Sequence, residues 1–328
     1  MAEHSTRNQD TMFHAADYHQ TDAETIAWIV TLAVVGALAI VINLLTLYTF
    51  LSATALRSRK HVMIMNLAAA DALFGVTGIP VYLVYLIRPQ LTLFYVWVMA
   101  SRFCKVASLF TVGVIAVERM HAIVCPLRHK TLSRLVFNIT IASIWICASA
   151  LTVSGLVVLF RNVDIITFLS LASVFTPVLT ITVVLVIGSC YIFIWVSYKR
   201  RRFHAINPST IRERSLALTL LLVSGAFLVT WCPPLLYLSV IPNCIDCIQP
   251  NIQILDWFVL VFGIQCLVNP AIYCYRLPLF KVSLKAVIKR VFVKCFHPCC
   301  NTAPKNSSIR PGDQKVQELQ KQPKVECN

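Results

Sequence analysis

Charged residues are scarce in this sequence. Asp, Glu, Lys and Arg make up 13% of the 328 residues, whereas 58% are hydrophobic. Soluble globular domains have about 25% charged residues, so this scarcity excludes an ordinary soluble protein of this length. The mean hydropathy of +0.73 agrees, and the composition indicates a membrane protein.

The sequence also lacks an internal repeat and a cluster of catalytic side chains at membrane depth. Transporters are often built from paired halves with helices broken in corresponding positions. An intramembrane enzyme needs a nucleophile with a base, or clustered His and carboxylates. Asp71 is the carboxylate placed deep in an apolar segment, and the eight His lie outside these segments or near their ends. We therefore expect neither a transporter, nor a channel, nor an enzyme with a cofactor.

Long apolar segments are what the sequence does contain. A bilayer core about 30 Å thick requires roughly 20 apolar residues per helix, and seven segments meet this length. They are residues 26–51, 62–87, 92–122, 135–160, 166–197, 214–241 and 250–275. The sequence predicts an all-α membrane protein that crosses the bilayer seven times.

Acidic residues are half as frequent as basic ones, with 14 Asp and Glu against 29 Lys and Arg. The basic residues gather after the first, third and fifth spans and along the tail, whereas the opposite side has little beyond Arg7, Arg88 and Arg161. By the positive-inside rule the N-terminus is extracellular and the tail is cytoplasmic. The net charge of +15 therefore reflects topology and attraction to an anionic leaflet, and we expect no nucleic-acid partner.

Isolated polar residues inside apolar spans are candidates for function, because hydrocarbon offers them no hydrogen bonds. Asn43, Asp71, Ser108 and Asn269 are such residues. A plain hydrogen bond between helices, worth about 0.6 kcal/mol, is the alternative for each of them. Asp71 differs, since a carboxylate at that depth must be protonated, solvated or matched by a cation.

These residues, taken in order along the spans, resemble the rhodopsin-like (class A) G-protein-coupled receptors over residues 26 to about 291. The matching residues are Asn43, Asp71 in LAAAD, Glu118-Arg119-Met120 in place of the family's Asp-Arg-Tyr, Trp145, Tyr191, Phe227 with Trp231-Cys232-Pro233, and Asn269-Pro270-Ala271-Ile272-Tyr273. The resemblance implies a seven-helix receptor of the plasma membrane that activates heterotrimeric G proteins.

The resemblance also implies a charge-pair switch at the inner end of the third span. Glu118 and Glu213 would hold Arg119 at rest, and outward movement of the sixth helix would release it towards the G protein. A pair partly screened at the membrane face is worth about 1 to 3 kcal/mol. On local sequence alone, Glu118 and Arg119 also fit a solvated helix end.

Other moving parts follow from the same resemblance. Pro233 and Pro270 would bend the sixth and seventh helices, and Trp231 would lie beneath the ligand, one turn above Phe227. Tyr273 would move against Tyr191. Asp71, Ser108 and Asn269 would form an internal site for an allosteric sodium ion.

The tail resembles that of the family as well. Residues 277–292 alternate apolar and basic side chains at helical spacing, which predicts an amphipathic eighth helix on the inner leaflet. We expect 1–25 to be an extracellular segment, 26–276 the bundle, and 293–328 a largely disordered cytoplasmic tail with few phosphorylation candidates, which leaves arrestin open as a partner. The cysteines Cys295, Cys299 and Cys300 follow the helix; we favour palmitoylation over a metal site there.

Two departures from the family lie on the extracellular side. Phe94 holds the place of the cysteine that most members tie to the second extracellular loop, and this loop, RNVDIITF, contains no cysteine. Val183 stands where the fifth helix usually has a proline. These losses resemble the melanocortin, cannabinoid and sphingosine-phosphate receptors. Cys244 and Cys247 in the third loop allow a disulfide or a metal clip, and we favour the disulfide.

The third span also carries the candidate ligand contacts. Val98, Ser101, Arg102 and Lys105 follow three- and four-residue spacing and so share a face, and the two basic residues lie roughly 14 to 20 Å from its outer end. We hypothesise a ligand whose anionic group pairs with Arg102 or Lys105. The alternative is internal neutralisation, for instance by Asp256.

Three known classes of ligand are disfavoured, because the residues that bind them in the family are absent from the matching positions of this sequence. Ser101 stands where amine receptors carry an aspartate, and Gly263 where opsins carry the retinal lysine. The acidic cluster of the melanocortin receptors is replaced by Val81, Phe94 and Val98. A melanocortin-like peptide receptor, an adenosine-like small-molecule receptor and a non-signalling seven-helix scaffold remain the alternatives.

Overall fold

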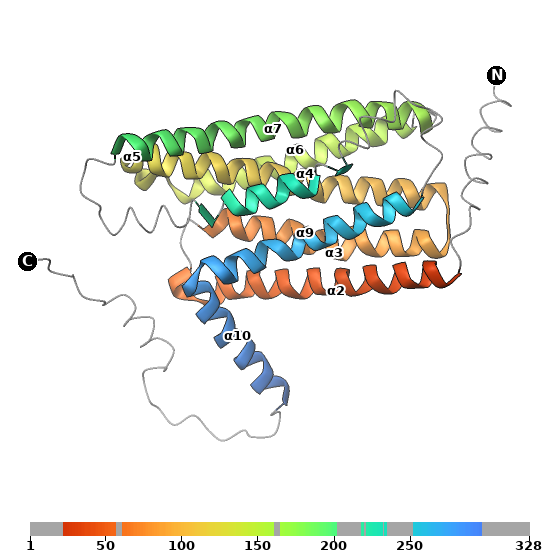
Figure 1. Cartoon of the computed structure of the whole chain (residues 1–328), viewed down its shortest axis with the longest axis horizontal. Helices are drawn as coiled ribbons and strands as arrows, with labels where there is room; N and C mark the ends of the chain where they lie inside the picture. The colour runs from red at the N-terminus through yellow and green to blue at the C-terminus, as the bar shows by residue number, and fades with distance from the viewer. Residues whose placement is uncertain are drawn as a thin grey trace, which may run out of the picture.

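The computed structural model describes residues 22–56, 61–160, 165–201, 218–219, 221–231, 233–234 and 252–296. Apart from α10 (Pro278–Phe296), the long helices of these residues run side by side as one bundle (Figure 1). The long helices are α2 (Asp22–Ser52), α3 (Val62–Ile87), α4 (Leu91–Val124), α6 (Arg134–Phe160), α7 (Ile165–Arg201) and α9 (Ile252–Arg276). A shorter apolar helix, Leu221–Trp231, belongs to the predicted sixth span.

Six helices are long and apolar enough to cross a membrane, and they match the first five predicted spans and the seventh. Their ends agree with the predicted ends to within a few residues. The helices begin or end slightly beyond the apolar segments because polar residues suit helix ends. Asp22 and Glu24 in the first turn of α2, for example, interact favourably with the helix dipole.

The outward face of α2 is apolar along its whole length. Large side chains on this face are 44% to 57% exposed: Val30, Val34, Leu38, Val41, Leu44, Tyr48 and Leu51. A continuous exposed apolar stripe of this length is incompatible with water. It fits a helix that faces lipid, so the structure supports a multi-pass membrane protein.

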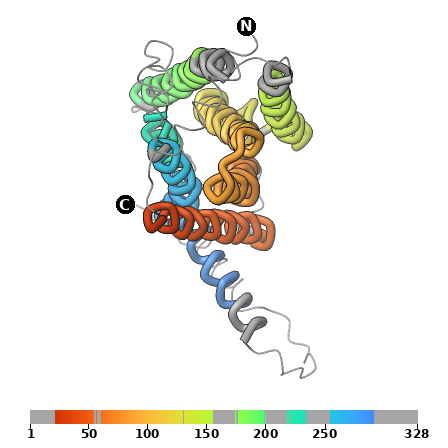
Figure 2. Tube along the Cα trace, turned by 90° about the vertical axis from the view of Figure 1, so that its right-hand side faces the viewer, coloured from red at the N-terminus to blue at the C-terminus, as the bar shows by residue number. Residues whose placement is uncertain are grey.

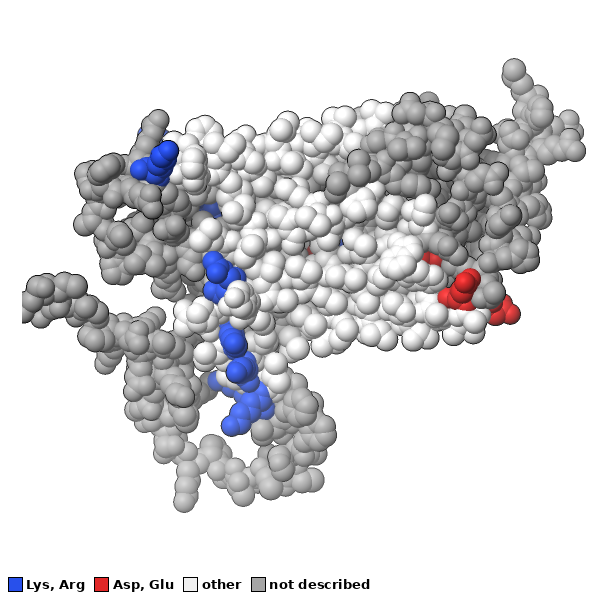
Figure 3. Space-filling view, viewed as in Figure 1, with Lys and Arg blue, Asp and Glu red and all other residues white. Residues whose placement is uncertain are grey.

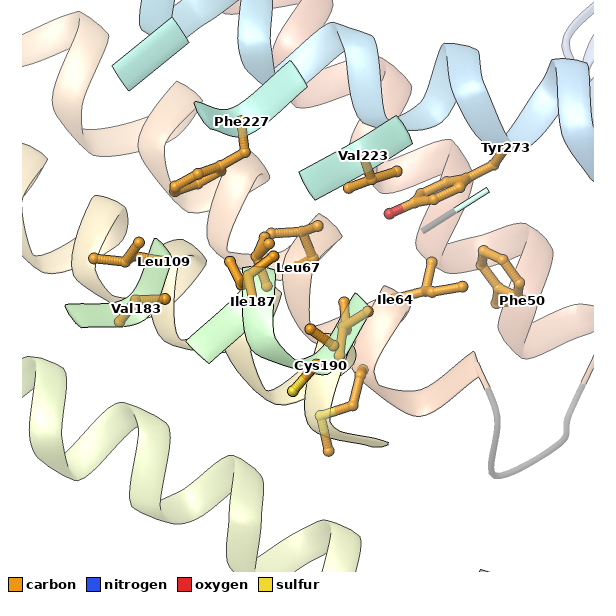
Figure 4. Packing of buried hydrophobic residues seen from close by; sticks show 14 of the residues in the cluster. Phe50, Ile64, Leu67, Leu109, Val183, Ile187, Cys190, Val223, Phe227 and Tyr273 are labelled. Atoms are coloured by element: carbon orange, nitrogen blue, oxygen red, sulfur yellow. The ribbon is translucent and has the colours of Figure 1, made fainter. Parts of the chain in front are cut away.

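The inner half of the bundle has a common hydrophobic core. Side chains from α2, α3, α4, α7, the Leu221–Trp231 helix and α9 point towards one another there (Figure 4). The labelled residues are Phe50, Ile64, Leu67, Leu109, Val183, Ile187, Cys190, Val223, Phe227 and Tyr273. Val183, which takes the place of the usual proline, is part of this core.

The outer half is held by an aromatic cluster, which we define as Tyr82, Tyr85, Phe94 and Trp97. The Tyr82 and Trp97 rings lie 4.7 Å apart, and Phe94 lies 5.8 Å from Tyr85 and 5.7 Å from Trp97. Phe94, at the place of the missing cysteine, therefore joins α4 to α3 through ring contacts. Such pairs stabilise by about 0.5–1.5 kcal/mol each beyond their buried area.

Gly263 lies where α9 packs closely against the side chain of Val35 on α2. A Cβ atom added at Gly263 would lie 2.5 Å from Cγ1 of Val35, well inside van der Waals contact. The residue at the retinal-lysine place thus has a packing role here, since a side chain there would require Val35 to shift.

The helix α10 (Pro278–Phe296) leaves the bundle at the end where the short helices α5 (Pro126–Thr131) and η2 (Thr54–Leu56) lie (Figures 1 and 2). Phe280 and Val287 are buried, whereas the basic side chains Lys281, Lys285, Lys289 and Arg290 are exposed. The predicted amphipathic eighth helix is therefore confirmed. It runs to Phe296 rather than residue 292, because the apolar and basic pattern continues, so Cys295 lies inside the helix and does not follow it.

Charge is divided between the two ends of the bundle. On the face shown in Figure 3, the described Lys and Arg side chains gather at the end near α10, and the described Asp and Glu side chains lie mainly at the opposite end, where α2 begins. Between these ends, the described residues on this face are almost free of exposed charge (Figure 3). This pattern fits a helix bundle placed across a bilayer.

Candidate functional site

The inner end of α4 buries a charged pair. Arg119 is fully buried and donates to both carboxylate oxygens of Glu118, with Nε 3.2 Å from Oε2 and a second contact from the guanidinium to Oε1. A solvated helix end would leave both groups in water. The structure instead buries the guanidinium against its acidic neighbour, which is one of the two contacts that the resemblance implies for the resting state.

A second group approaches Glu118 from α5. His129 Nε2 lies 3.6 Å from Glu118 Oε1, and the His129 ring contacts the ring of His121 edge to face at 5.6 Å. Sequence reasoning missed His129, because a turn after Pro126 gives no periodic signal of where its side chains point. Glu213, the other predicted partner of Arg119, lies outside the described residues.

The two switch tyrosines have different partners in this structure. The Tyr191 hydroxyl lies 3.5 Å from the Ser224 hydroxyl, between α7 and the Leu221–Trp231 helix. Tyr273 is fully buried, with its ring 6.5 Å from that of Phe50 and 6.2 Å from that of Phe280. Their predicted movement against each other stays a prediction.

The polar residues predicted at the centre of the bundle lie together. Asn269 Nδ2 donates to Asp71 Oδ2 at 2.7 Å, and the Ser108 hydroxyl donates to Asp71 Oδ1 at 3.3 Å. Asn43 donates from Nδ2 to the carbonyl oxygen of Cys266 at 3.0 Å. Asp71 thereby joins α3, α4 and α9, and Asn43 joins α2 to α9.

Lys105 also reaches this centre, which was not expected. Its side chain is 4% exposed, and its Nζ donates to the carbonyl oxygen of Phe262 at 3.2 Å and lies 3.7 Å from Cys266 Sγ. The ammonium lies 4.0 Å from the centre of the Phe74 ring and 4.8 Å from that of Phe262. Desolvated cation–π contacts are worth about 2 kcal/mol each, which offsets part of the cost of burying the charge.

A neighbouring network joins three helices through Asn66. Trp145 Nε1 donates to Asn66 Oδ1 at 2.9 Å, and Asn66 Nδ2 donates to the Thr111 hydroxyl at 2.8 Å. Trp145 therefore anchors α6 to α3 and α4. Sequence reasoning found Trp145 but missed Asn66, whose signal was present as an isolated amide five residues before Asp71.

The predicted ligand residues are only partly gathered. Ser101 Oγ is buried without a hydrogen-bond partner, and Arg102 is half-buried, with no hydrogen bond or ion pair to any described residue. Val98 is half-buried on the same helix. Lys105 instead points to the central cluster, so the shared face divides into two environments.

Trp231 and Asp256, the other predicted ligand residues, have partners on α9 and α3. Trp231 stacks on Phe227 at 5.3 Å and touches the Phe262 ring at 5.6 Å. Asp256 is fully buried and accepts a hydrogen bond of 2.9 Å from the Tyr82 hydroxyl. Neutralisation of Arg102 or Lys105 by Asp256 stays a prediction.

The residues around Asp71 do not fit the sodium ion that the resemblance implies. Both carboxylate oxygens already accept hydrogen bonds, and the buried ammonium of Lys105 interacts electrostatically with the carboxylate. A sodium ion would be a second positive charge beside one carboxylate in a region of low dielectric constant.

The predicted prolines lie in described parts of the chain, whereas most of the predicted disulfide and palmitoylation cysteines do not. Pro270 lies inside α9 and Pro233 is exposed with helical backbone. Cys244, Cys247, Cys299 and Cys300 lie outside the described residues, as does the side chain of Cys295. The disulfide and the palmitoylation therefore stay predictions.

Comparison with known proteins places these features in a family. A family model described as "7 transmembrane receptor (rhodopsin family)" matches residues 42–273. The adenosine receptor A2b of Mus musculus is 23% identical over 341 residues, which covers 92% of this chain and 99% of that receptor.

Two other relatives match over a shorter stretch. The histamine H1 receptor of Bos taurus is 29% identical over 133 residues, or 38% of this chain and 26% of that receptor. The neuropeptide FF receptor 1 of Homo sapiens is 31% identical over 153 residues, or 42% of this chain and 34% of that receptor. These matches span only about a quarter to a third of the two relatives, and the three names indicate different ligands.

Proposed function

This chain belongs to the rhodopsin family of seven-transmembrane receptors, and we propose that it signals from an extracellular ligand to heterotrimeric G proteins by outward movement of the sixth helix. As a member of that family it is a receptor protein and not an enzyme. The observation that carries the proposal is the buried Glu118–Arg119 pair at the inner end of α4.

The pair can act as a switch because its charges are buried. Burying a guanidinium is costly unless an acidic group lies beside it, so any movement that separates Arg119 from Glu118 favours a new acidic or carbonyl partner. A G protein inserted at the opened inner end would supply one.

We propose the plasma membrane as the site of action, with residues 1–25 outside and the tail from 293 inside. The grouping of basic residues near α10 supports this orientation (Figure 3). Palmitoylation at Cys295, Cys299 or Cys300 would anchor α10 to the inner leaflet, and arrestin is a further partner of the tail.

For the ligand, we propose a molecule with a carboxylate or phosphate group that pairs with Arg102. The half-buried guanidinium and the unpartnered Ser101 hydroxyl supply donors in the outer half of α4. An adenosine-like small molecule is the second candidate, favoured by the match along nearly the whole of adenosine receptor A2b. A peptide ligand and a non-signalling scaffold are the remaining alternatives.

Basal G-protein activation tests the signalling proposal. The wild type, Arg119→Ala and Glu213→Gln would be compared across a panel of G-protein subtypes at matched surface expression. We expect the receptor to activate one subtype. Basal activation of that subtype should rise with Glu213→Gln and fall to background with Arg119→Ala. A pair worth about 1 to 3 kcal/mol shifts a two-state ratio by roughly 5- to 150-fold.

The control for this experiment is Arg134→Ala, which removes the same charge from an exposed position at the inner end of α6. It should retain the wild-type response. Silence of every subtype in every variant would contradict the signalling proposal and favour the scaffold.

A further inference from the structure

The centre of the bundle holds one buried ammonium and one buried carboxylate on neighbouring helices. Asp71 on α3 is fully buried, and Lys105 on α4 is 4% exposed. The two do not touch directly. Both contact the same turn of α9: Lys105 Nζ lies 3.7 Å from Cys266 Sγ, and Asn269, three residues further on, donates to Asp71 Oδ2 at 2.7 Å. An ammonium and a carboxylate buried in the same part of the bundle can balance each other's charge.

The geometry points to Lys105 as the resident counter-cation of Asp71, taking the place of a sodium ion at the centre of this receptor. Its ammonium has a complete set of partners on other helices: the Phe262 carbonyl oxygen, the Cys266 thiol, and the Phe74 and Phe262 rings. It is therefore held in place at the centre and not extended towards the outer half.

The Lys105 ammonium and a sodium ion would exclude each other at Asp71, because of the charge balance. One carboxylate neutralises one cation, and a second cation beside it would be repelled strongly because the surroundings have a low dielectric constant. Unlike a free ion, a covalently attached ammonium cannot dissociate when the salt concentration falls. We expect the stability of this protein to be independent of which monovalent cation is present.

The position of Lys105 also connects the centre to the outer half. The Phe262 ring contacts both the Lys105 ammonium and Trp231, the latter at 5.6 Å between ring centres. Displacement of Trp231 would therefore shift the Phe262 ring and change its contact with the Lys105 ammonium. Signalling is not required for this inference, which concerns the resting protein alone.

Thermal unfolding of the purified full chain in lipid nanodiscs tests the inference. The melting temperature would be measured in sodium chloride and in choline chloride at equal ionic strength. We expect no difference for the wild type. For Lys105→Ser, we expect a melting temperature about 3 °C higher in sodium chloride, because ligand binding stabilises the folded state. The double variant Lys105→Ser with Asp71→Asn should lose this sodium effect.

Two outcomes would overturn the inference. The first is a sodium-specific rise for the wild type that Asp71→Asn abolishes, which needs only the native receptor and this one variant. The second is a folded Lys105→Ser that stays indifferent to sodium.

A charge cycle covers the case in which Lys105→Ser does not fold. Asp71→Asn and Lys105→Met should each lower the melting temperature. The melting temperature of the neutral double variant should fall by less than the sum of the two single decreases. Additive losses would show that the two charges are uncoupled and would refute the inference.

Discussion

Arg102 and Lys105 are three positions apart on α4, but their surroundings differ. Three residues turn a helix by about 300°, which leaves the two side chains about 60° apart around its axis. That rotation directs Lys105 between α3 and α9, whereas Arg102 stays half-buried in the outer half. Of the two basic residues, Arg102 is the one available to a ligand.

Arg102→Gln should therefore weaken the response to an anionic agonist found by screening carboxylates and phosphates in the cell assay. A lost charge-assisted hydrogen bond corresponds to a rise of about 10- to 100-fold in the half-maximal concentration. The control is Arg88→Gln, which makes the same change at an exposed position at the outer end of α3. An unchanged response in Arg102→Gln would remove Arg102 from the ligand site.

The sequence marked Asp71 as a residue that needs a partner, because a carboxylate at membrane depth must be matched. That Ser108 and Asn269 lie beside it followed from the resemblance to the receptor family and not from the chemistry of Asp71 alone. The environment of Lys105 and the contact of His129 with Glu118 could not be predicted. Helical spacing predicts which residues share one side of a helix. The contacts of these residues depend on the neighbouring helices and, for His129, on the turn after Pro126.

At the scale of the helices, the aromatic cluster stabilises the outer end of α4 where most relatives have a disulfide. Phe94, Trp97, Tyr82 and Tyr85 join α3 to α4, and the Tyr82 hydrogen bond to Asp256 extends the connection to α9. A disulfide acts mainly on the unfolded chain, whereas these rings act through contacts in the folded state.

Phe94→Ala should therefore destabilise the protein by about 1 to 3 kcal/mol, less than for a fully buried ring. Its melting temperature in detergent should fall by about 5 °C. Ile87→Ala, which removes an exposed apolar side chain at the same end of the bundle, is the control. Equal melting temperatures for the two variants would contradict a stabilising role for the cluster.

The helices themselves were the most predictable part of the fold. Each span must satisfy its backbone hydrogen bonds internally, so a long apolar segment specifies both a helix and its length. The cluster of aromatic residues was not predicted, because tyrosine and tryptophan near a span end are equally typical of lipid interfaces. Only the packing of α3 against α4 distinguishes the two.

At the scale of the whole molecule, the central claim is that the Glu118–Arg119 pair favours a closed inner end. Glu118 neutralises a buried guanidinium, and losing that charge should shift the population towards the state in which the sixth helix has moved outward. The effect has to appear without ligand and without G protein, since the pair lies within one helix.

The most direct test is the distance between spin labels at Leu135, on the inner end of α6, and Leu218, near the inner end of the sixth helix. Both side chains are exposed, and genetically encoded labels leave the 13 native cysteines unchanged. Glu24→Gln, at the opposite end of the bundle, is the control. We predict a larger population at long distance in Glu118→Gln than in the wild type and the control. Identical distance distributions in all three would contradict the charge-pair switch.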